Sequence, residues 1–160
     1  MLNDILKILE NDARTTPQTI ACMTGQSEAE VKDLIKQAEA DRAIIKYKTV
    51  VDWEKLGNEQ VLALIEVKVT PQRDVGFDAI AERIYRFPEA RSVYLVSGTY
   101  DLAVIVVGKT MQQVANFVAQ KLAPIEGVQG AVTHFLMRRY KEDGEVFAGG
   151  DENRRQPVVL

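Results

Sequence analysis

Residues 93–107 read VYLVSGTYDLAVIVV, and this stretch decides the fold of the second half of the chain. Two runs rich in β-branched residues flank the turn-forming segment 97–100, which predicts two strands joined by a hairpin. Residues 102–107 are apolar at consecutive positions, so we expect a central strand that is buried on both faces. Gly98 is expected in the tight turn because such a turn favours a residue that tolerates a positive φ.

The segments on either side of this hairpin complete a βαββαβ pattern. Apolar and polar residues alternate over 60–70, which predicts a strand, and a helix over 76–87 follows. After the hairpin, a helix capped by Thr110 precedes a last strand over 128–140. This order is that of the ferredoxin-like, split βαβ fold, so we expect an α+β protein.

The predicted sheet carries apolar residues on both of its faces. Leu62 and Leu64 lie opposite the core-facing positions of strand 60–70, and residues 102–107 are apolar throughout. Because helices on one side leave the second face of the sheet bare, apolar residues there need another cover. We therefore expect the chain to assemble with copies of itself, burying about 800 Å² per partner in an interface of standard size.

The N-terminal half begins with two predicted helices. Apolar residues at helical spacing predict a first helix that ends near Asn11. Thr16 and Pro17 suit the cap and the first position of a second, short helix that runs to about Met23. We expect Met23 to face inward and Cys22, beside it, to be a small buried apolar side chain.

A third helix and a strand follow. Gly25 breaks the second helix, and Ser27 with Glu30 forms the sequence signature of a capping box for a helix that ends near Asp41. The second and third helices, joined by this tight turn, have helix-turn-helix proportions. Residues 44–51 are dominated by β-branched and aromatic side chains and predict a strand, which would be a wing or a linker strand.

These elements predict three segments. Residues 1–58 form a winged helix-turn-helix domain with its linker strand, and residues 53–58 are the expected hinge. Residues 59–141 form the βαββαβ domain, and residues 142–160 form a loose polar tail.

Composition excludes several classes of function. The 160 residues carry a net charge of -3 and hold one histidine, His134, and one cysteine, Cys22. These two residues leave little for metal or triad chemistry, so we expect no cofactor, no metal and no enzymatic activity. No apolar run reaches the roughly 18–20 residues that span a bilayer, and the first residues do not read as a signal peptide. We therefore expect a cytoplasmic protein without a membrane partner.

Three motifs occur in order along the chain. Residues 5–14 read ILKILENDAR, residues 97–102 read SGTYDL with a G-x-Y-D hairpin pattern, and residues 121–128 read KLAPIEGV with an L-x-x-I-x-G-V pattern. Together they resemble the opening motif, the hairpin and the helix-to-strand turn of the Lrp/AsnC (feast/famine) family of transcriptional regulators. The resemblance implies a homodimer or higher even oligomer, palindromic double-stranded DNA sites, and an amino acid or related small effector that binds between modules near the hairpin.

The resemblance and the charge pattern together indicate candidate site residues. Basic side chains and the helix cap in and after the third helix are the candidates for DNA contact: Ser27, Lys32, Lys36, Arg42, Lys46 and Lys48. The hairpin and the last strand supply the candidates for effector contact: Gly98, Thr99, Tyr100, Asp101 and Thr133. For Asp101 a second interpretation stays open, in which its carboxylate satisfies backbone N–H groups of the turn.

The third helix also motivates an alternative function. Residues 27–41 hold five acidic and two basic side chains, and an acidic helix is repelled by phosphate charge. The alternative is a metabolite-binding oligomerisation module whose helix-turn-helix has lost DNA contact.

Overall fold

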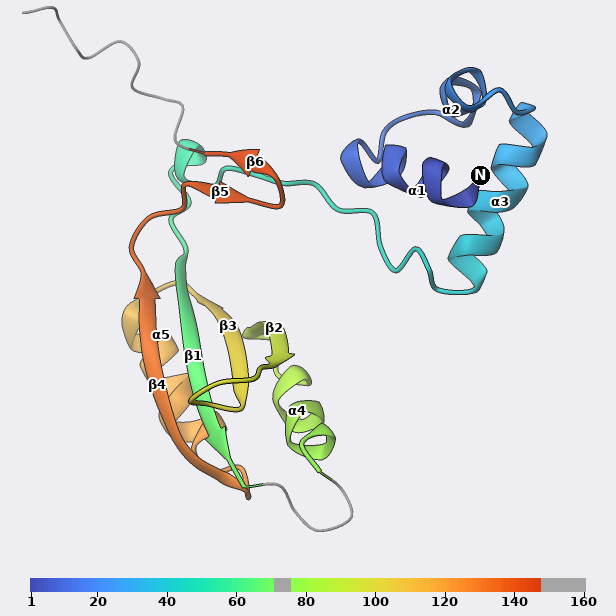
Figure 1. Ribbon diagram of the computed structural model, residues 1–160. Coiled ribbons are helices and arrows are strands. Elements are labelled where there is room, and N and C mark those ends of the chain that lie inside the picture. Colours follow the sequence, from blue (N-terminus) through green and yellow to red (C-terminus); the bar gives the residue numbers. More distant parts are fainter. Residues whose placement is uncertain (71–75, 148–160) are drawn as a thin grey trace, which may run out of the picture. The chain divides into compact units, whose positions relative to one another are not determined.

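The computed structural model describes residues 1–70 and 76–147, and the chain divides into two compact units, Met1–Val50 and Val51–Leu160 (Figure 1). The first unit ends eight residues before the boundary that was expected after residue 58. Each unit has a hydrophobic core of its own.

The first unit is built from three helices: α1 (Leu2–Asn11), α2 (Pro17–Thr24) and α3 (Glu28–Ala40). The Thr16 hydroxyl accepts a hydrogen bond from the backbone N–H of Thr19 at 3.2 Å, and Pro17 occupies the first turn of α2. Gly25 ends α2 with a φ of 70°, and the capping box of Ser27 begins α3. The three helices and the tight turn between α2 and α3 confirm the predicted helix-turn-helix. Their core is formed by Ile5, Leu9, Ile20, Ala21 and Val31.

The expected burial of Cys22 and Met23 is wrong. Both side chains are exposed, Met23 to 63%. Successive helix residues are about 100° apart, so a buried stripe centred between Ile20 and Ala21 leaves Met23 more than about 100° away from it. A helix as short as α2 buries this one stripe and no more.

The expected strand over 44–51 is not formed, so the described residues contain no wing. The backbone there has no ladder partner, and Ile45 is 80% exposed. A β-propensity pattern becomes a strand only when a neighbour accepts and donates its hydrogen bonds, and this unit supplies no other strand. Residues 44–51 are therefore an extended segment that leads into the second unit.

The second unit carries the βαββαβ module. Its elements are η1 (Glu54–Leu56), β1 (Val61–Val69), α4 (Asp78–Tyr85), β2 (Ala90–Leu95), β3 (Leu102–Gly108), α5 (Met111–Phe117), η2 (Val118–Leu122) and β4 (Val128–Leu136). The sheet order is β2-β3-β1-β4 and every pairing is antiparallel, which is the ferredoxin-like arrangement. Both predicted helices and all four strands of the module are confirmed.

Helices α4 and α5 pack on one face of the sheet. Ile80 and Ile84 from α4 and Val114 and Phe117 from α5 join one core with every second residue of β1 and β3. The other face is covered by no element of the part of the chain that the structure describes, although it is rich in apolar side chains. Leu62, Leu64, Ile105 and Val107 there are half-buried, and Val132 and Leu136 are 55% and 48% exposed.

The last strand is shorter than expected. Strand β4 ends at Leu136, which pairs with Leu62, one residue from the start of its partner β1 at Val61. Residues 141–146 then form a small hairpin, β5 (Lys141–Glu142) and β6 (Glu145–Val146), so the expected loose tail from residue 142 is wrong as far as 146. Asp143 and Gly144, both at positive φ, make its two-residue turn. The rest of that tail, from residue 148, lies outside the described residues.

Candidate DNA-binding and effector-binding sites

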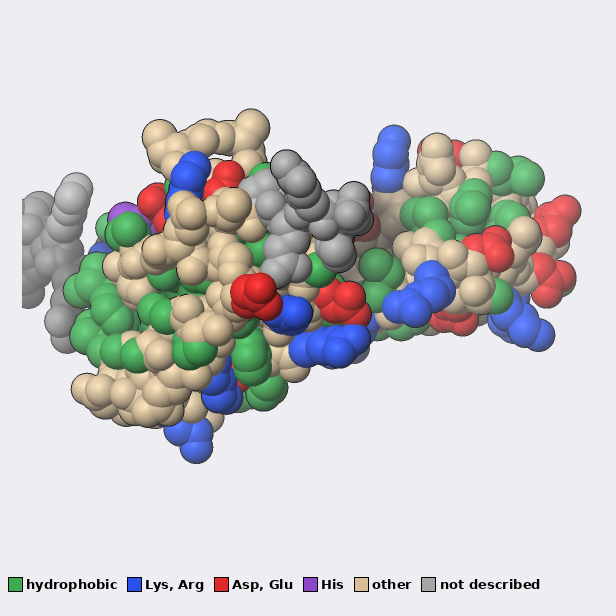
Figure 2. All heavy atoms as spheres, turned by 90° about the horizontal axis from the view of Figure 1, so that it is seen from below, with side chains coloured by type: hydrophobic (Ala, Val, Ile, Leu, Met, Phe, Trp, Pro, Cys, Tyr) green, Lys and Arg blue, Asp and Glu red, His purple; other side chains and the backbone are tan. Residues whose placement is uncertain are grey.

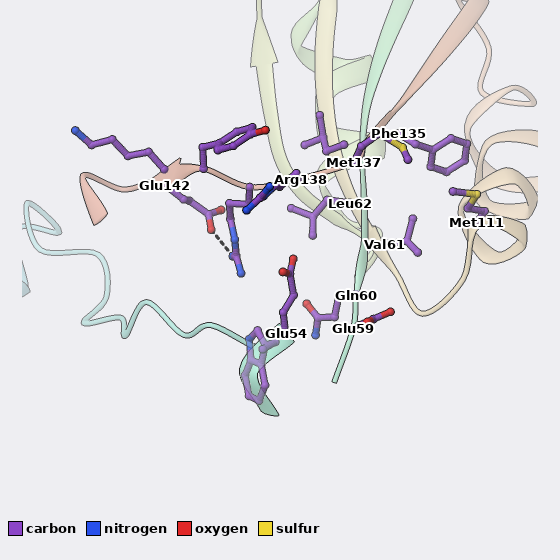
Figure 3. A pocket seen from close by; sticks show the side chains of 15 residues that line it. Glu54, Glu59, Gln60, Val61, Leu62, Met111, Phe135, Met137, Arg138 and Glu142 are labelled. Atoms are coloured by element: carbon purple, nitrogen blue, oxygen red, sulfur yellow. Dashed lines mark hydrogen bonds and ion pairs between the residues drawn. The ribbon is translucent and has the colours of Figure 1, made fainter. Parts of the chain in front are cut away.

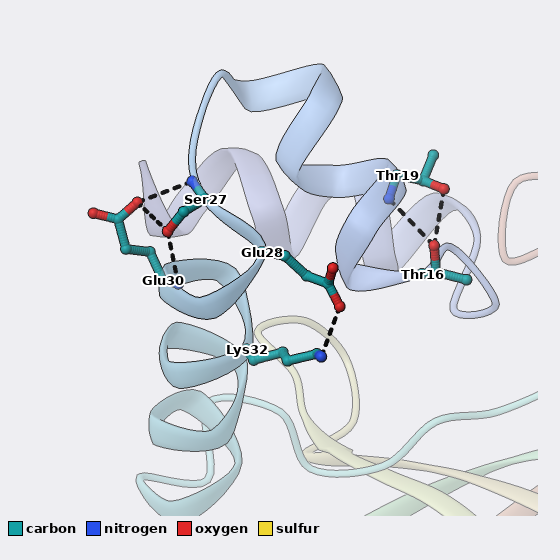
Figure 4. A network of polar contacts seen from close by, with 6 residues as sticks. All are labelled: Thr16, Thr19, Ser27, Glu28, Glu30 and Lys32. Carbon is teal, nitrogen blue, oxygen red and sulfur yellow. Dashed lines mark hydrogen bonds and ion pairs between the residues drawn. The ribbon is translucent and has the colours of Figure 1, made fainter.

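The first turn of α3 is held by hydrogen bonds between side chain and backbone (Figure 4). The Ser27 hydroxyl accepts from the backbone N–H of Glu30 at 3.2 Å, and the Glu30 carboxylate accepts from the Ser27 N–H at 2.9 Å and hydroxyl at 2.7 Å. These hydrogen bonds from Ser27 hold the pKa of Glu30 below its usual value. Of the predicted DNA-binding residues, Ser27 therefore acts first as the cap that fixes where α3 begins.

The predicted cations all lie at the surface of the first unit. Lys32 and Lys36 are four residues apart on one stripe of α3, and Lys32 pairs with Glu28 at 2.6 Å. Arg42, at a φ of 58°, turns the chain away after α3 ends. Lys46 and Lys48 are exposed on the extended segment rather than on the strand that was expected.

The acidic groups of α3 are largely engaged within the unit. Besides Glu30 in its cap and Glu28 beside Lys32, Glu39 accepts a hydrogen bond from the Tyr47 hydroxyl at 2.8 Å. In the view of Figure 2, both signs of charge lie side by side on the first unit. Of these contacts only that between Glu28 and Lys32 joins opposite charges, and the formal count of five acids and two bases already includes Lys32, so the net charge of α3 still repels a DNA backbone.

The predicted hairpin residues lie between β2 and β3, at one end of the sheet. The Asp101 carboxylate accepts a hydrogen bond from the backbone N–H of Val69 at 2.9 Å and lies 3.6 Å from the Lys68 ammonium. Lys68 in turn donates to the Thr99 carbonyl at 3.3 Å. The pairing of β1 with β4 shifts register between Lys68 and Val69, so Asp101 binds the backbone at a β-bulge.

Asp101 consequently has a structural task that neither sequence interpretation contained. Its carboxylate does satisfy a backbone N–H, but that N–H lies on β1 rather than within its own turn. Because the two residues are 32 positions apart, no local pattern could have indicated this contact. The salt bridge with Lys68 also engages the carboxylate that was expected to contact an effector.

The expected conformation of Gly98 is wrong. Its φ is not in the left-handed region, and a Cβ built on it would meet nothing within 4 Å. The backbone N–H of Val96 donates to the carbonyl of Asp101 at 2.9 Å and closes the connection between β2 and β3. The chain therefore reverses over a wider loop than a tight turn. Gly98 thus leaves open space at the surface of the hairpin.

Thr133 does not join the hairpin within one chain. It pairs with Ile65 on β1, whereas Asp101 binds at Val69, about 13 Å further along that strand. Thr133 is half-buried on the face that the helices cover. His134 faces the opposite side, as its position in the strand predicts, and its Nε2 lies 3.3 Å from Glu66 Oε1 on the bare face.

A groove of about 740 Å³ lies where β1 begins and β4 ends (Figure 3). Val61, Leu62, Phe135 and Met137 contribute apolar surface to it, and Arg139 pairs with Glu142 at 2.6 Å along its rim. The sequence pattern gave no signal for this groove, because residues from both ends of the second unit form it. Among the described residues, no group of three His, Cys, Asp or Glu side chains could hold a metal, and no helix is long and apolar enough to cross a membrane.

A helix-turn-helix unit followed by a ferredoxin-like module defines a class of two-part DNA-binding regulators. Residues 62–146 match the Lrp/AsnC ligand binding domain. The chain is 49% identical over 153 residues to an uncharacterised HTH-type transcriptional regulator, YugG, of Bacillus subtilis, covering 95% of this chain and 92% of the relative. It is 30% identical over 142 residues to the HTH-type transcriptional regulator FL11 of Pyrococcus horikoshii, covering 89% and 91%. The chain therefore belongs to the Lrp/AsnC family, a family of transcriptional regulators rather than of enzymes.

Solved structures show the same fold. The crystal structure of PH0061 superposes with a TM-score of 0.75 at 20% identity, over 88% of this chain and 93% of that one. The transcriptional regulator NMB0573 of Neisseria meningitidis, solved as an L-Met complex, gives a TM-score of 0.71 at 22% identity, over 88% and 90%. The α+β architecture expected from the sequence is confirmed.

Proposed function

We propose that this chain is a transcriptional regulator that binds double-stranded DNA through its helix-turn-helix and whose oligomeric state or DNA affinity is modulated by an amino acid or a related metabolite. The observation that carries this proposal is the match of residues 62–146 to a ligand binding domain, in a chain whose first unit is a capped helix-turn-helix. The names of the relatives favour it over a module that has lost DNA contact. Such a regulator acts in the cytoplasm, where it meets DNA.

The DNA-facing surface is proposed on α3 and the segment after it. Lys36, Arg42 and Lys46 are exposed there and are able to reach phosphates. In a dimer, two such units would lie one turn of duplex apart, roughly 34 Å, and read a palindromic site.

The bare face of the sheet is the proposed interface between copies. Leu64 and Ile105 pair across β1 and β3 in the middle of this face, with Leu62 and Val107 as the next pair. Apolar side chains on both neighbouring strands make a contiguous surface, and the exposure of such a surface to water is unfavourable. A second copy that packs its own sheet on this surface would also enclose the Glu66–His134 pair.

The hairpin is the proposed effector-binding element. The open surface at Gly98 lets a ligand approach the backbone of Thr99 and Tyr100, and Asp101 holds this loop against β1. Thr133 remains in the proposed set as its weakest member, because it lies on the helix-covered face. Binding would change the oligomer or the DNA affinity only to the extent that the effector prefers one state over the other.

DNA binding is tested by fluorescence anisotropy with the full chain and duplex DNA taken from upstream of its own gene, over a series of salt concentrations. We expect binding whose logarithmic affinity falls linearly with the logarithm of salt concentration. Lys36→Ala should lower this slope by about one, whereas Lys109→Ala, an equal charge change in the second unit, should leave it unchanged. A folded oligomer that binds no duplex at low salt would exclude DNA from the function.

A further inference from the structure

The first turn of α3 carries a carboxylate and an ammonium group as an outward-facing pair. Glu28 is the first residue of α3 and Lys32 lies one turn further on the same stripe (Figure 4). Glu28 Oε1 and Lys32 Nζ are 2.6 Å apart, and the side chains are 46% and 60% exposed. Both groups therefore keep much of their surface available to a partner.

Two other acids of α3, Glu30 and Glu39, have partners of their own. Glu30 is held by Ser27 in the capping box, and Glu39 accepts from Tyr47. Helix-turn-helix proteins place the N-terminal residues of the second helix at base edges in the major groove. Glu28 is consequently the carboxylate best placed to meet a base if α3 enters the groove.

We propose that Glu28 and Lys32 act as one unit that reads a C·G base pair, with Glu28 on cytosine and Lys32 on guanine; this inference rests on the proposed DNA-binding function. Cytosine presents its N4 amino donor in the major groove, and the paired guanine presents the acceptors O6 and N7. N4 and O6 are joined by a base-pair hydrogen bond of about 2.9 Å. An acceptor and a donor 2.6 Å apart on α3 therefore face a donor and an acceptor at nearly the same separation.

The same pair of side chains disfavours the alternative base pairs. An A·T pair also offers a donor beside an acceptor, but adenine N7 then repels the Glu28 carboxylate and the thymine methyl group meets the Lys32 ammonium. A G·C pair in the reversed orientation places acceptors against Glu28 and a donor against Lys32. Repulsion at the wrong bases adds to attraction at the right base pair. Glu28 and Lys32 are therefore selective together although their charges sum to zero.

The test is selection of duplexes from a random-sequence library by the full chain, repeated with Glu28→Gln, Glu28→Ala and Glu10→Gln. Glu10→Gln is the matched control, because it removes the same charge from the exposed end of α1. We expect one C·G position in each half-site selected by the wild-type chain, with a preference of about tenfold. Glutamine pairs in bidentate fashion with adenine, so Glu28→Gln should raise the share of A·T at that position. Glu28→Ala should weaken the preference for C·G without abolishing it, because Lys32 still meets guanine, and Glu10→Gln should retain C·G.

Two outcomes overturn the inference in different ways. A wild-type selection that Glu28→Gln leaves unchanged, or that contains no position preferring C·G, refutes the reading by Glu28 and Lys32 while DNA binding stands. A wild-type chain that retains no duplex at low salt refutes the proposed function and this inference with it. Far-ultraviolet circular dichroism of each variant establishes that α3 is still folded.

Discussion

Replacing Gly127 by alanine is the sharpest test of how the second unit is packed. Gly127 joins η2 to β4 with a φ of 95°, and its carbonyl accepts the backbone N–H of Thr70 at 2.8 Å. A Cβ at this position would lie 2.6 Å from Ile80 Cδ1 and 3.3 Å from the Thr70 carbonyl oxygen. Ile80 is 2% exposed in the core between α4 and the sheet, so it has little room to move.

Two contributions set the expected loss of stability. Backbone strain for a residue with a Cβ in a sparsely populated region costs about 1–3 kcal/mol. Forcing a core side chain away from an inserted methyl group costs about another 1–3 kcal/mol. We therefore expect Gly127→Ala to lower the free energy of unfolding of the second unit by about 2–6 kcal/mol, a lowering of the melting temperature by at least about 8 °C.

The assay is calorimetric melting at one fixed protein concentration, since assembly makes the transition depend on concentration. Gly98→Ala is the control, because that position has open space and an ordinary φ, and it should change stability by less than about 0.5 kcal/mol. The double variant Ile80→Val/Gly127→Ala lacks the clashing Cδ1 atom, so it should lose less than the two single variants added together. A Gly127→Ala chain that melts together with the Gly98→Ala control would refute this account of the turn.

Three further perturbations follow from the contacts above. Ser27→Ala removes the cap of α3 and should destabilise the first unit by about 1 kcal/mol in chemical denaturation. The folded pKa of Glu30 is lowered, so its stabilising contribution is complete above its unfolded pKa of about 4.3 and is lost as pH falls through the lower folded value. Ser27→Ala should therefore make the stability of the first unit less dependent on pH in this acid range. An unchanged pH dependence would contradict the capping box. Asp101→Ala leaves the Val69 N–H without its acceptor, so it should lower the free energy of unfolding by about 1–3 kcal/mol and speed hydrogen exchange of that amide. Asp101→Asn keeps an acceptor and should lose less stability. Equal exchange in the wild-type chain and both variants would count against the contact. Leu64→Glu on the bare sheet face should give a folded monomer in sedimentation velocity, while the control Met23→Glu, in the first unit, should keep the oligomer. A Leu64→Glu chain that still assembles would exclude this face as the interface.

Local sequence signals predicted most of the elements, because caps, turns and periodicity depend on neighbouring residues. Thr16 and Ser27 begin their helices where the sequence placed them, and the alternation of 60–70 identified β1 and its buried face. The pair Asp143–Gly144 was an equally local signal for a hairpin, and the sequence interpretation overlooked it.

The features that the sequence could not predict depend on distant partners. Residues 44–51 have a strand-like composition but no neighbour to pair with, and β4 ends at Leu136, beside the start of its partner β1. Gly98 and Gly127 both lie in turns, and the positive φ of Gly127 together with the approach of Ile80 distinguishes the one that must be glycine.

The candidate sites divide in the same way. The exposed cations on α3, Lys32 and Lys36, could be located from helix periodicity, whereas the contact of Asp101 with Val69 needed the folded sheet. No sequence pattern indicated that Asp101 forms an ion pair with Lys68, which lies on β1.

The two cores of this chain have no residue in common. A substitution that loosens the packing around Ile5 therefore needs no compensating change around Ile65, and the reverse holds as well. Over evolutionary time, the half proposed to bind DNA and the half that matches a ligand binding domain are free to drift separately. A lineage can then alter DNA binding or ligand binding by changing one half alone.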